Sequence, residues 1–317
     1  MIRQRRLLSV ERRFDMFFTK MHGCGNDYIY FNCFKETVAD PVSLSIRLSD
    51  RHKGIGGDGI ILIKPSDRAD FFMDMYNLDG SRGKMCGNAI RCVGKYVYDR
   101  GMTDKKEITV DTLSGIKGLK LMTADEFRAS GGTVPEEMKD IPSKDAGGRD
   151  IISFVTVDMG APVTDIAAIP LNTDIIKEYK LGYTLGAMAR ALRFTFVSMG
   201  NPHAVTFVDD IMTAPVEELG PAYEHHDIFP EQANIEFVHV IDRKSIEFRV
   251  WERGSGETQA CGTGACASAY ASVLNGFTDD EMNVHMLGGD LRIRYDRELD
   301  RIFMTGPAVE VFSGEVD

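Results

Sequence analysis

The chain repeats a set of glycine-marked features at one spacing, and this repeat limits the folds open to it more than any other feature. Features of the first half return 175 positions later in the same order: Gly25-Asn26 as Gly200-Asn201, Cys86-Gly87 as Cys261-Gly262, and Gly101 as Gly276. Ordered features that recur at a fixed offset indicate a duplicated structural unit. We therefore expect two similar domains that face each other.

Each predicted unit is rich in strands and contains one long helix. Segments such as Ser245–Trp251 alternate between apolar and polar residues, which is typical of a half-buried strand. Residues 86–99 and 261–274 have helical spacing and are apolar around most of their circumference, which indicates buried helices. We expect an α+β fold of two pseudo-symmetric domains, each a curved, mixed or antiparallel, barrel-like β-sheet wrapped around a long central helix. The polar stretch 123–150 is expected to hold hairpin tips or a loop near a domain boundary.

Composition and charge exclude several classes of protein. A length of 317 residues suits two domains of ordinary size. The formal net charge of -11 argues against a nucleic-acid partner, because phosphate contacts need a basic surface. No apolar run reaches the roughly 18–20 residues that span a bilayer, so we expect no membrane partner. The arginine-rich arm, residues 1–15, is interpreted as a disordered extension or an upstream start codon, with a transit peptide as the alternative.

The cysteines fall into two groups. We expect reduced thiols, because no secretory signal precedes them. The chain has no Cys-x-x-Cys, and the spacings of Cys86 to Cys92 and of Cys261 to Cys266 do not place both sulfurs on one helical face, so we predict no metal site. Four cysteines are interpreted as small buried hydrophobic residues: Cys24, Cys33, Cys92 and Cys266.

Cys86 and Cys261 are different, because each stands at the start of its helix and is followed by glycine. Unpaired N–H groups and the helix dipole at such a position favour a thiolate, lower its pKa and bind a carboxylate. Two such helix ends at one cleft would hold one carboxylate and present two sulfurs. A thiolate on one face of an α-carbon and a thiol on the other can invert it, and the two pKa values then belong to the pair.

At these residues the sequence resembles the diaminopimelate epimerase family. The resemblance covers nearly all of residues 16–317 and rests on six blocks in order. The blocks are Phe18-Thr19-Lys20-Met21-His22-Gly23-Cys24-Gly25-Asn26-Asp27, Asp50-Arg51-His52-Lys53-Gly54-Ile55-Gly56-Gly57-Asp58-Gly59, Asn77-Leu78-Asp79-Gly80-Ser81, Met85-Cys86-Gly87-Asn88-Ala89-Ile90-Arg91-Cys92, Met199-Gly200-Asn201-Pro202-His203, and Glu252 through Gly264.

The resemblance implies interconversion of LL- and meso-diaminopimelate without pyridoxal phosphate or another cofactor, in lysine and peptidoglycan-precursor synthesis. It implies Cys86 and Cys261 as the acid/base pair, with His203 and Glu252 tuning them. The substrate contacts that it implies are Asn26, Asn77, Gly87, Asn88, Asn201, Asn234, Arg253, Gly262 and Thr263. The helix starts suit the reacting carboxylate, and Arg253 suits the distal one.

The resemblance also implies the domain boundaries, the assembly and the location. We expect an N-terminal domain of residues 16–155 plus 303–317, a C-terminal domain of residues 156–302, a possible homodimer and a cytoplasmic enzyme. Some family members carry a glutamine in place of Gly59, so any substrate contact there must come from backbone, water or a neighbour.

Two other readings remain open. The first is a proline or hydroxyproline racemase-like enzyme of the same fold, although such enzymes usually have histidine in place of Asn88. The second is a thiol-based redox or binding protein without turnover, which would have no reason to keep the cysteine pair.

Overall fold

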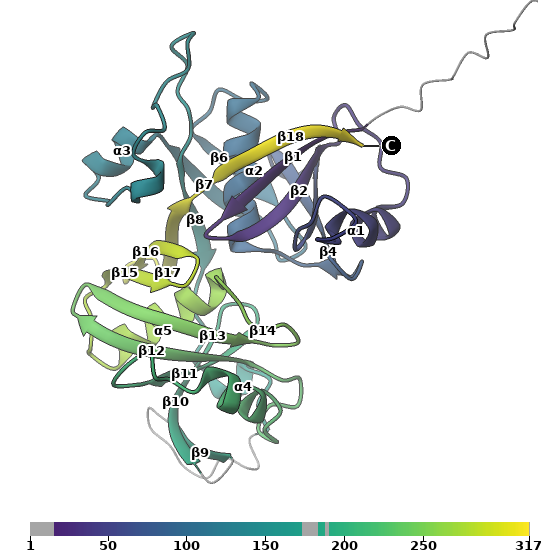
Figure 1. The fold of residues 1–317 in the computed structure, drawn as a ribbon. Coiled ribbons are helices and arrows are strands. Elements are labelled where there is room, and N and C mark those ends of the chain that lie inside the picture. The colour runs from purple at the N-terminus through teal and green to yellow at the C-terminus, as the bar shows by residue number, and fades with distance from the viewer. Residues whose placement is uncertain (1–15, 173–182, 188–189, 317) are drawn as a thin grey trace, which may run out of the picture.

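The computed structural model describes residues 16–172, 183–187 and 190–316 (Figure 1). The basic arm, expected to be disordered, lies outside the described residues. The helices are α1 (Pro41–Ser49), α2 (Gly87–Asp99), α3 (Ala124–Ala129), α4 (Val216–Glu224) and α5 (Gly262–Leu274), with 3-10 turns at Glu136–Met138 and Ile166–Ala168. None of these described helices is long and apolar enough to cross a membrane.

The strands occupy both halves of the chain. Those of the first half are β1 (Met16–Gly23), β2 (Asn26–Asn32), β3 (Gly59–Lys64), β4 (Phe71–Asn77), β5 (Arg82–Gly83), β6 (Glu107–Asp111), β7 (Lys117–Met122) and β8 (Phe154–Gly160). Those of the second half are β9 (Tyr183–Ala187), β10 (Arg190–Ser198), β11 (Pro202–Phe207), β12 (Asn234–Asp242), β13 (Ser245–Glu252), β14 (Gly256–Glu257), β15 (Glu281–Met286), β16 (Gly289–Asp296), β17 (Arg301–Pro307) and β18 (Val309–Val316).

The two halves have the same strand pairing, which confirms the predicted duplication. In the first half β1 and β2 are antiparallel, β2 and β3 parallel, β3 and β4 antiparallel, and β4 and β6 parallel. The second half repeats this sequence of pairings with β10, β11, β12, β13 and β15. Helices α1 and α4 begin 175 residues apart, as do α2 and α5. The offset that three glycine-marked features share therefore extends to whole elements.

Each half wraps its sheet around one buried helix, as the fold prediction states. Helix α2 packs against β1, β2, β7 and β8, and α5 packs against β10 to β13 and β15 to β17 (Figure 1). All residues of α2 from Gly87 to Tyr98 are buried. A helix buried on every face must be apolar or fully hydrogen-bonded. Helix α5 consists mostly of small and apolar residues, whereas the buried Arg91 and Lys95 of α2 donate to backbone carbonyls.

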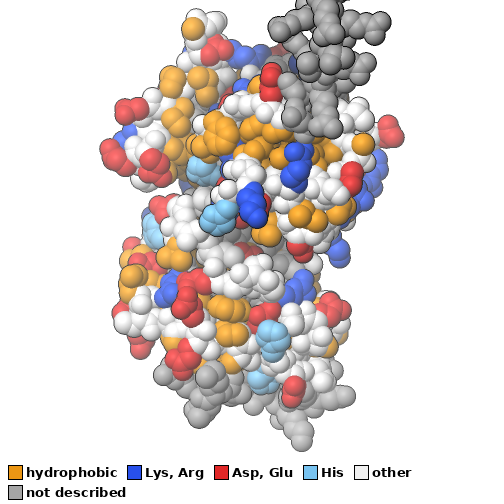
Figure 2. Space-filling model, turned by 45° about the vertical axis from the view of Figure 1, so that its right-hand side comes forward, with side chains coloured by type: hydrophobic (Ala, Val, Ile, Leu, Met, Phe, Trp, Pro, Cys, Tyr) orange, Lys and Arg blue, Asp and Glu red, His pale blue; other side chains and the backbone are white. Residues whose placement is uncertain are grey.

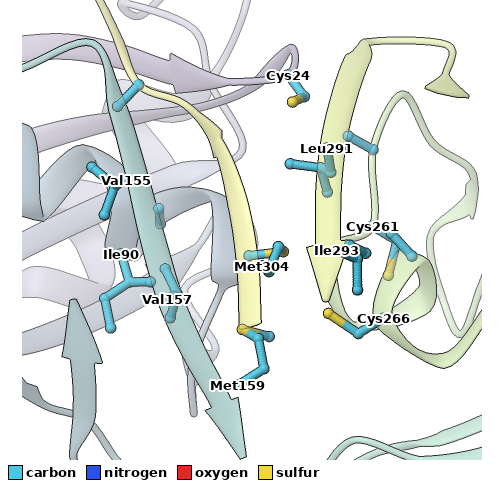
Figure 3. Close-up of a cluster of buried hydrophobic side chains, with 14 of the residues drawn as sticks. Cys24, Ile90, Val155, Val157, Met159, Cys261, Cys266, Leu291, Ile293 and Met304 are labelled. Atoms are coloured by element: carbon cyan, nitrogen blue, oxygen red, sulfur yellow. The ribbon is translucent and has the colours of Figure 1, made fainter. Parts of the chain in front are cut away.

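The sheets of the two halves are joined where β8 pairs with β17. Strand β17 also pairs with β16, and β18 continues into the N-terminal half to pair with β1. One hydrophobic cluster crosses the junction, with Met304 of β17 between Ile90 of α2 and Cys266 of α5 (Figure 3). The expected domain boundaries stay a prediction. The boundary after residue 155 falls inside β8, and the boundary after residue 302 falls inside β17.

Two segments differ from the sequence-based expectation. The polar stretch 123–150 contains a helix, α3, whose N-terminus is closed by a capping box in which Thr123 accepts from the Glu126 N–H and Glu126 accepts from the Thr123 N–H. This Ser/Thr-x-x-Glu spacing is a helix-start signal, so the segment is more than a loop. Helix α4 was not expected, because Gly220 and Pro221 stand in its interior and glycine and proline usually end a helix.

Candidate active site

The N-termini of α2 and α5 lie against each other at the junction of the two halves. A Cβ atom added to Gly262 would lie 3.6 Å from the Cα of Gly87 and 3.2 Å from the Met304 sulfur. A Cβ added to Gly87 would lie 2.8 Å from the Cε of Met304. Glycine at both positions therefore allows the two helix starts to approach over one methionine, as the repeat predicts.

Cys86 is the N-cap residue of α2 and is half-buried. Its backbone is extended, with φ -131° and ψ 122°, and its sulfur accepts from the Ala89 N–H at 3.5 Å. Its S–H donates to Oδ1 of Asn26 at 3.2 Å. Asn26 opens β2, so the Gly-Asn turn of the first half places an amide directly on the first thiol.

Cys261 holds the matching position on α5 and is more deeply buried. Its sulfur accepts from the Gly264 N–H at 3.4 Å and lies 3.6 Å from the Thr263 hydroxyl oxygen. Glu252, at the end of β13, also hydrogen-bonds the Cys261 side chain and accepts from the Thr258 hydroxyl. The second thiol thus faces a carboxylate, whereas the first faces an amide.

Both thiols have raised pKa values, which corrects the sequence-based expectation of lowered ones. Burial is the largest cause at Cys86, and the helix N–H groups of Asn88 and Ala89 only partly oppose it. Burial also raises the pKa of Cys261 well above its ordinary value, and the carboxylates Glu252 and Glu236 raise it further. The helix-terminus effect is present at both sulfurs, but loss of hydration outweighs it in this state.

A charged network fixes the asparagine that touches Cys86. Asn26 Nδ2 donates to Asp58 at 2.6 Å, and Arg51 bridges Asp58 at 3.0 Å and Asp27 at 2.7 Å. Lys20 completes the network on Asp27 at 2.6 Å. Burial raises the pKa of Asp58. The first two sequence blocks therefore meet to hold one amide in place.

His203 lies fully buried in β11, between a carboxylate and an amide. Its Nδ1 is 2.6 Å from Oε1 of Glu236, and its Nε2 is 3.1 Å from Oδ1 of Asn201. Asn201 in turn donates from Nδ2 to the Thr263 hydroxyl at 3.4 Å. His203 is thus connected to the start of the Cys261 helix through Asn201, and its predicted tuning of Cys261 would act through these two hydrogen bonds.

Asn88 joins the two helix starts directly. Its side chain is 1% exposed, and Nδ2 donates to the carbonyl of Ala260, the residue before Cys261, at 3.3 Å. Its Oδ1 is buried and has no hydrogen-bond partner within the described ranges. A buried acceptor left open at this point suits a ligand that brings an N–H donor.

The other expected contact residues already make hydrogen bonds within the chain, and they differ in burial. Asn234 is buried and clamps the backbone, donating to Pro202 O at 3.0 Å and accepting from the Arg253 N–H at 3.0 Å. Asn77 donates to the Ser81 hydroxyl at 3.0 Å. Arg253 is exposed and donates from Nη1 to Glu231 O at 2.9 Å. In this structure Asn234 shapes the site, while the Arg253 guanidinium extends toward solvent.

The backbone at Gly59 admits glycine alone. A Cβ at this position would lie 2.0 Å from Tyr76 O and 3.0 Å from the Cα of Asn77, at φ 153°. The glutamine of other family members cannot replace Gly59 without moving β3 away from β4.

Two charged residues near the helix starts are 0% exposed and were not among the sequence-based candidates: Glu236 and Arg91. Glu236 lies between Ile235 and Phe237, so a lone charge in an apolar strand was the only signal. Arg91 is 0% exposed inside α2 and donates to the carbonyls of Pro307 and Gly87 at 3.0 and 3.2 Å. Arg91 stands in the Cys86 block, but helical periodicity alone does not show that it points inward.

Known proteins share both the sequence and the fold. A family model described as diaminopimelate epimerase matches residues 18–135 and 195–311. The chain belongs to the diaminopimelate epimerase family. It is therefore an amino-acid epimerase, which is an isomerase. A diaminopimelate epimerase of Acetivibrio thermocellus is 51% identical over 302 residues, which cover 95% of this chain and 99% of that relative. One of Agathobacter rectalis is 50% identical over 307 residues, with the same coverage.

Solved structures show how widely this fold is shared. A Bacillus anthracis phenazine biosynthesis protein of the PhzF family matches the enzyme with a TM-score of 0.63 and 16% identity, covering 96% of this chain and all of that one. A hydroxyproline epimerase of Agrobacterium vitis matches with a TM-score of 0.62 and 14% identity, covering 96% and 93%. At such identities these likenesses support the predicted α+β fold, and the fold alone.

Proposed function

We propose that this enzyme interconverts LL- and meso-diaminopimelate by a two-thiol mechanism without pyridoxal phosphate, in lysine and peptidoglycan-precursor synthesis. The observation that carries the proposal is the mirrored placement of Cys86 and Cys261 as N-caps of two helices whose first residues are neighbours. The relatives named diaminopimelate epimerase support the choice of substrate.

Inversion transfers a proton at each face of the α-carbon. One cysteine, as thiolate, takes the α-proton: the C–H bond breaks, an S–H bond forms, and the electron pair stays on the substrate. The other cysteine then gives its proton to the opposite face, so an S–H bond breaks and a new C–H bond forms. Negative charge spreads onto the reacting carboxylate between these steps, where the N–H groups at both helix starts stabilise it.

The polar residues around the helix starts suit a substrate with two zwitterionic ends. The open Oδ1 of Asn88 suits an ammonium group beside the reacting carbon. The exposed Arg253 suits the distal carboxylate through a bidentate contact. Amides donate and accept, so the expected distal contacts are assigned to amide side chains: Asn26, Asn77, Asn201 and Asn234.

His203 and Glu252 are proposed to tune the sulfurs. Glu252 hydrogen-bonds Cys261 and raises its pKa, so it favours the thiol form that acts as the acid. His203 reaches the same helix start through Asn201.

We also propose a cytoplasmic homodimer. Within the described ladders β18 pairs with β1 alone, which leaves its other edge for a second chain. Its Val311 and Phe312 are 54% and 47% exposed, and Phe17, opposite Glu315 on the neighbouring β1, is 40% exposed. Figure 2 shows hydrophobic side chains gathered on the surface of this N-terminal half. An apolar strand edge of this kind is typical of a pairing surface.

The test of the reaction is a parallel assay on LL-diaminopimelate, proline and hydroxyproline. We expect conversion of the first to the meso form and none of the other two. Conversion of proline or hydroxyproline alone would favour the racemase-like alternative. No turnover with any of the three would favour a binding protein.

A further inference from the structure

The buried carboxylate of Glu236 has no part in the two-thiol reaction as proposed. Its side chain is 0% exposed on β12, on the face that α5 covers: a Cβ added to Gly264 would lie 3.1 Å from Oε1. Its second oxygen, Oε2, is buried without a hydrogen-bond partner in the described part of the chain. A buried carboxylate that is only half satisfied destabilises a fold, so this position calls for a function.

Glu236 begins a chain of contacts that ends on the second sulfur. It meets His203 Nδ1 at 2.6 Å, and His203 Nε2 meets Asn201 Oδ1 at 3.1 Å. Asn201 Nδ2 meets Thr263 Oγ1 at 3.4 Å, and Thr263 Oγ1 lies 3.6 Å from Cys261 Sγ. Four contacts therefore connect a fully buried carboxylate to a reacting thiol.

The chain has a direction that the donors and acceptors determine. Asn201 Oδ1 only accepts, so Nε2 of His203 carries a proton and donates it. Asn201 Nδ2 donates to the Thr263 oxygen, which leaves the Thr263 hydroxyl proton free to point at Cys261 Sγ. Every link from His203 onward then donates toward the sulfur, and the last donor favours its thiolate.

Glu236 supports this direction by the proton it shares with His203. Because Nε2 already carries one proton, the contact at Nδ1 needs a second. This proton lies either on His203, which then donates to the Glu236 carboxylate, or on Glu236, which then donates as a carboxylic acid. Either arrangement leaves the Glu236–His203 pair with no net charge. The pair therefore holds Nε2–H toward Asn201 without adding negative charge near the thiolate.

We propose that Glu236 is a positioning residue for Cys261, acting through the His203–Asn201–Thr263 chain. The inference rests on the proposed two-thiol reaction. The titratable groups around Cys261 are Glu252 from β13, Glu236 from β12 and His203 from β11. A negative charge on either glutamate raises the pKa of the Cys261 thiol. The proton shared with His203 removes this charge from Glu236, so the chain of donors is what remains of its effect on the sulfur.

The experiment compares E236Q with wild type by the pH dependence of iodoacetamide alkylation, with Cys261 and Cys86 resolved by peptide mass spectrometry. We expect the Cys261 midpoint in E236Q to rise by about one pH unit, the equivalent of one hydrogen bond to a charged group. The Cys86 midpoint should stay unchanged and is the internal control. D74N removes another buried carboxylate, paired with Lys64 and Arg82, and should move neither midpoint.

T263V tests the same chain from its other end, at a partly exposed helix start, and keeps the proposal testable should E236Q fail to fold. T263V should raise the Cys261 midpoint, and E236Q added to T263V should raise it no further, because both act through one path. An unchanged or lowered midpoint in E236Q or T263V overturns the inference, since a lowered one makes Glu236 merely a nearby negative charge. Wild-type protein that fails to epimerise diaminopimelate overturns the proposed function, and the inference with it.

Discussion

At the scale of single residues, burial and helix position act in opposite directions on the two thiols. The sequence shows the helix starts and so predicts lowered pKa values, but it does not show how far the closed sheets exclude water. Burial wins at Cys86 and Cys261, and the pKa of each is raised. Glu236 was missed for a related reason, since only the fold shows that its side chain faces α5.

The raised pKa values lead to a prediction about alkylation. Each thiol keeps its proton below its folded pKa, which lies above the ordinary value of about 8.5. Inactivation of the ligand-free enzyme by iodoacetamide should therefore be slow at pH 7 and accelerate only as the pH rises above the ordinary thiol value. The rate is measured as loss of epimerase activity against pH. A rate that already levels off below pH 7 would show that the helix ends outweigh burial.

At the scale of elements, the proposed catalytic geometry depends on the close approach of α2 and α5. Their bounds are predictable, because a Cys-Gly start and a glycine stop mark both. Helix α4 is not predictable in this way, because packing against β13 overrides the helix-breaking residue Pro221. The contact of Gly87 with Gly262 is visible only in three dimensions, although the repeat indicates that the two glycines are equivalent.

This contact predicts the effect of a single methyl group. In G262A the new Cβ would lie 3.2 Å from the Met304 sulfur and in ordinary van der Waals contact with the Cα of Gly87 at 3.6 Å, so the Met304 side chain beneath both helix starts must shift by a few tenths of an ångström. A misplacement of about 1 Å can cost roughly a hundredfold in rate, so this smaller shift should lower kcat by well under a hundredfold. The control is G118A in β7, where the nearest atom to an added Cβ is 4.0 Å away. Equal kcat in G262A and wild type would mean that the helix ends need not touch.

At the scale of the whole molecule, the last strands connect the two halves. Strand β17 pairs with β8, and β18 pairs with β1, so the C-terminus returns to the first half. The duplication could be predicted from sequence, since its markers are glycines and cysteines at fixed positions. These returning pairings could not, because the partners are far apart in the chain and their apolar patterns fit several registers.

The free edge of β18 yields a prediction about assembly. F312D places a charge among the exposed apolar side chains of this edge and should shift a dimer toward monomer. Light scattering after size-exclusion chromatography measures the mass, with 35.3 kDa expected for the monomer. L299D, at an exposed leucine in the turn between β16 and β17, is the matched control. A wild-type protein that is monomeric at all concentrations contradicts the dimer.

The central claim is that Cys86 and Cys261 exchange protons with the two faces of one α-carbon. Proton NMR of LL-diaminopimelate in D2O follows this directly, since epimerisation replaces the α-proton with deuterium. Wild type and C33A, which changes a half-buried cysteine outside the site, should remove the α-proton signal at similar rates. C86A and C261A should each slow epimerisation by about 10²- to 10⁴-fold, the value of one acid–base role. Epimerisation at the wild-type rate by either variant would contradict the two-thiol mechanism.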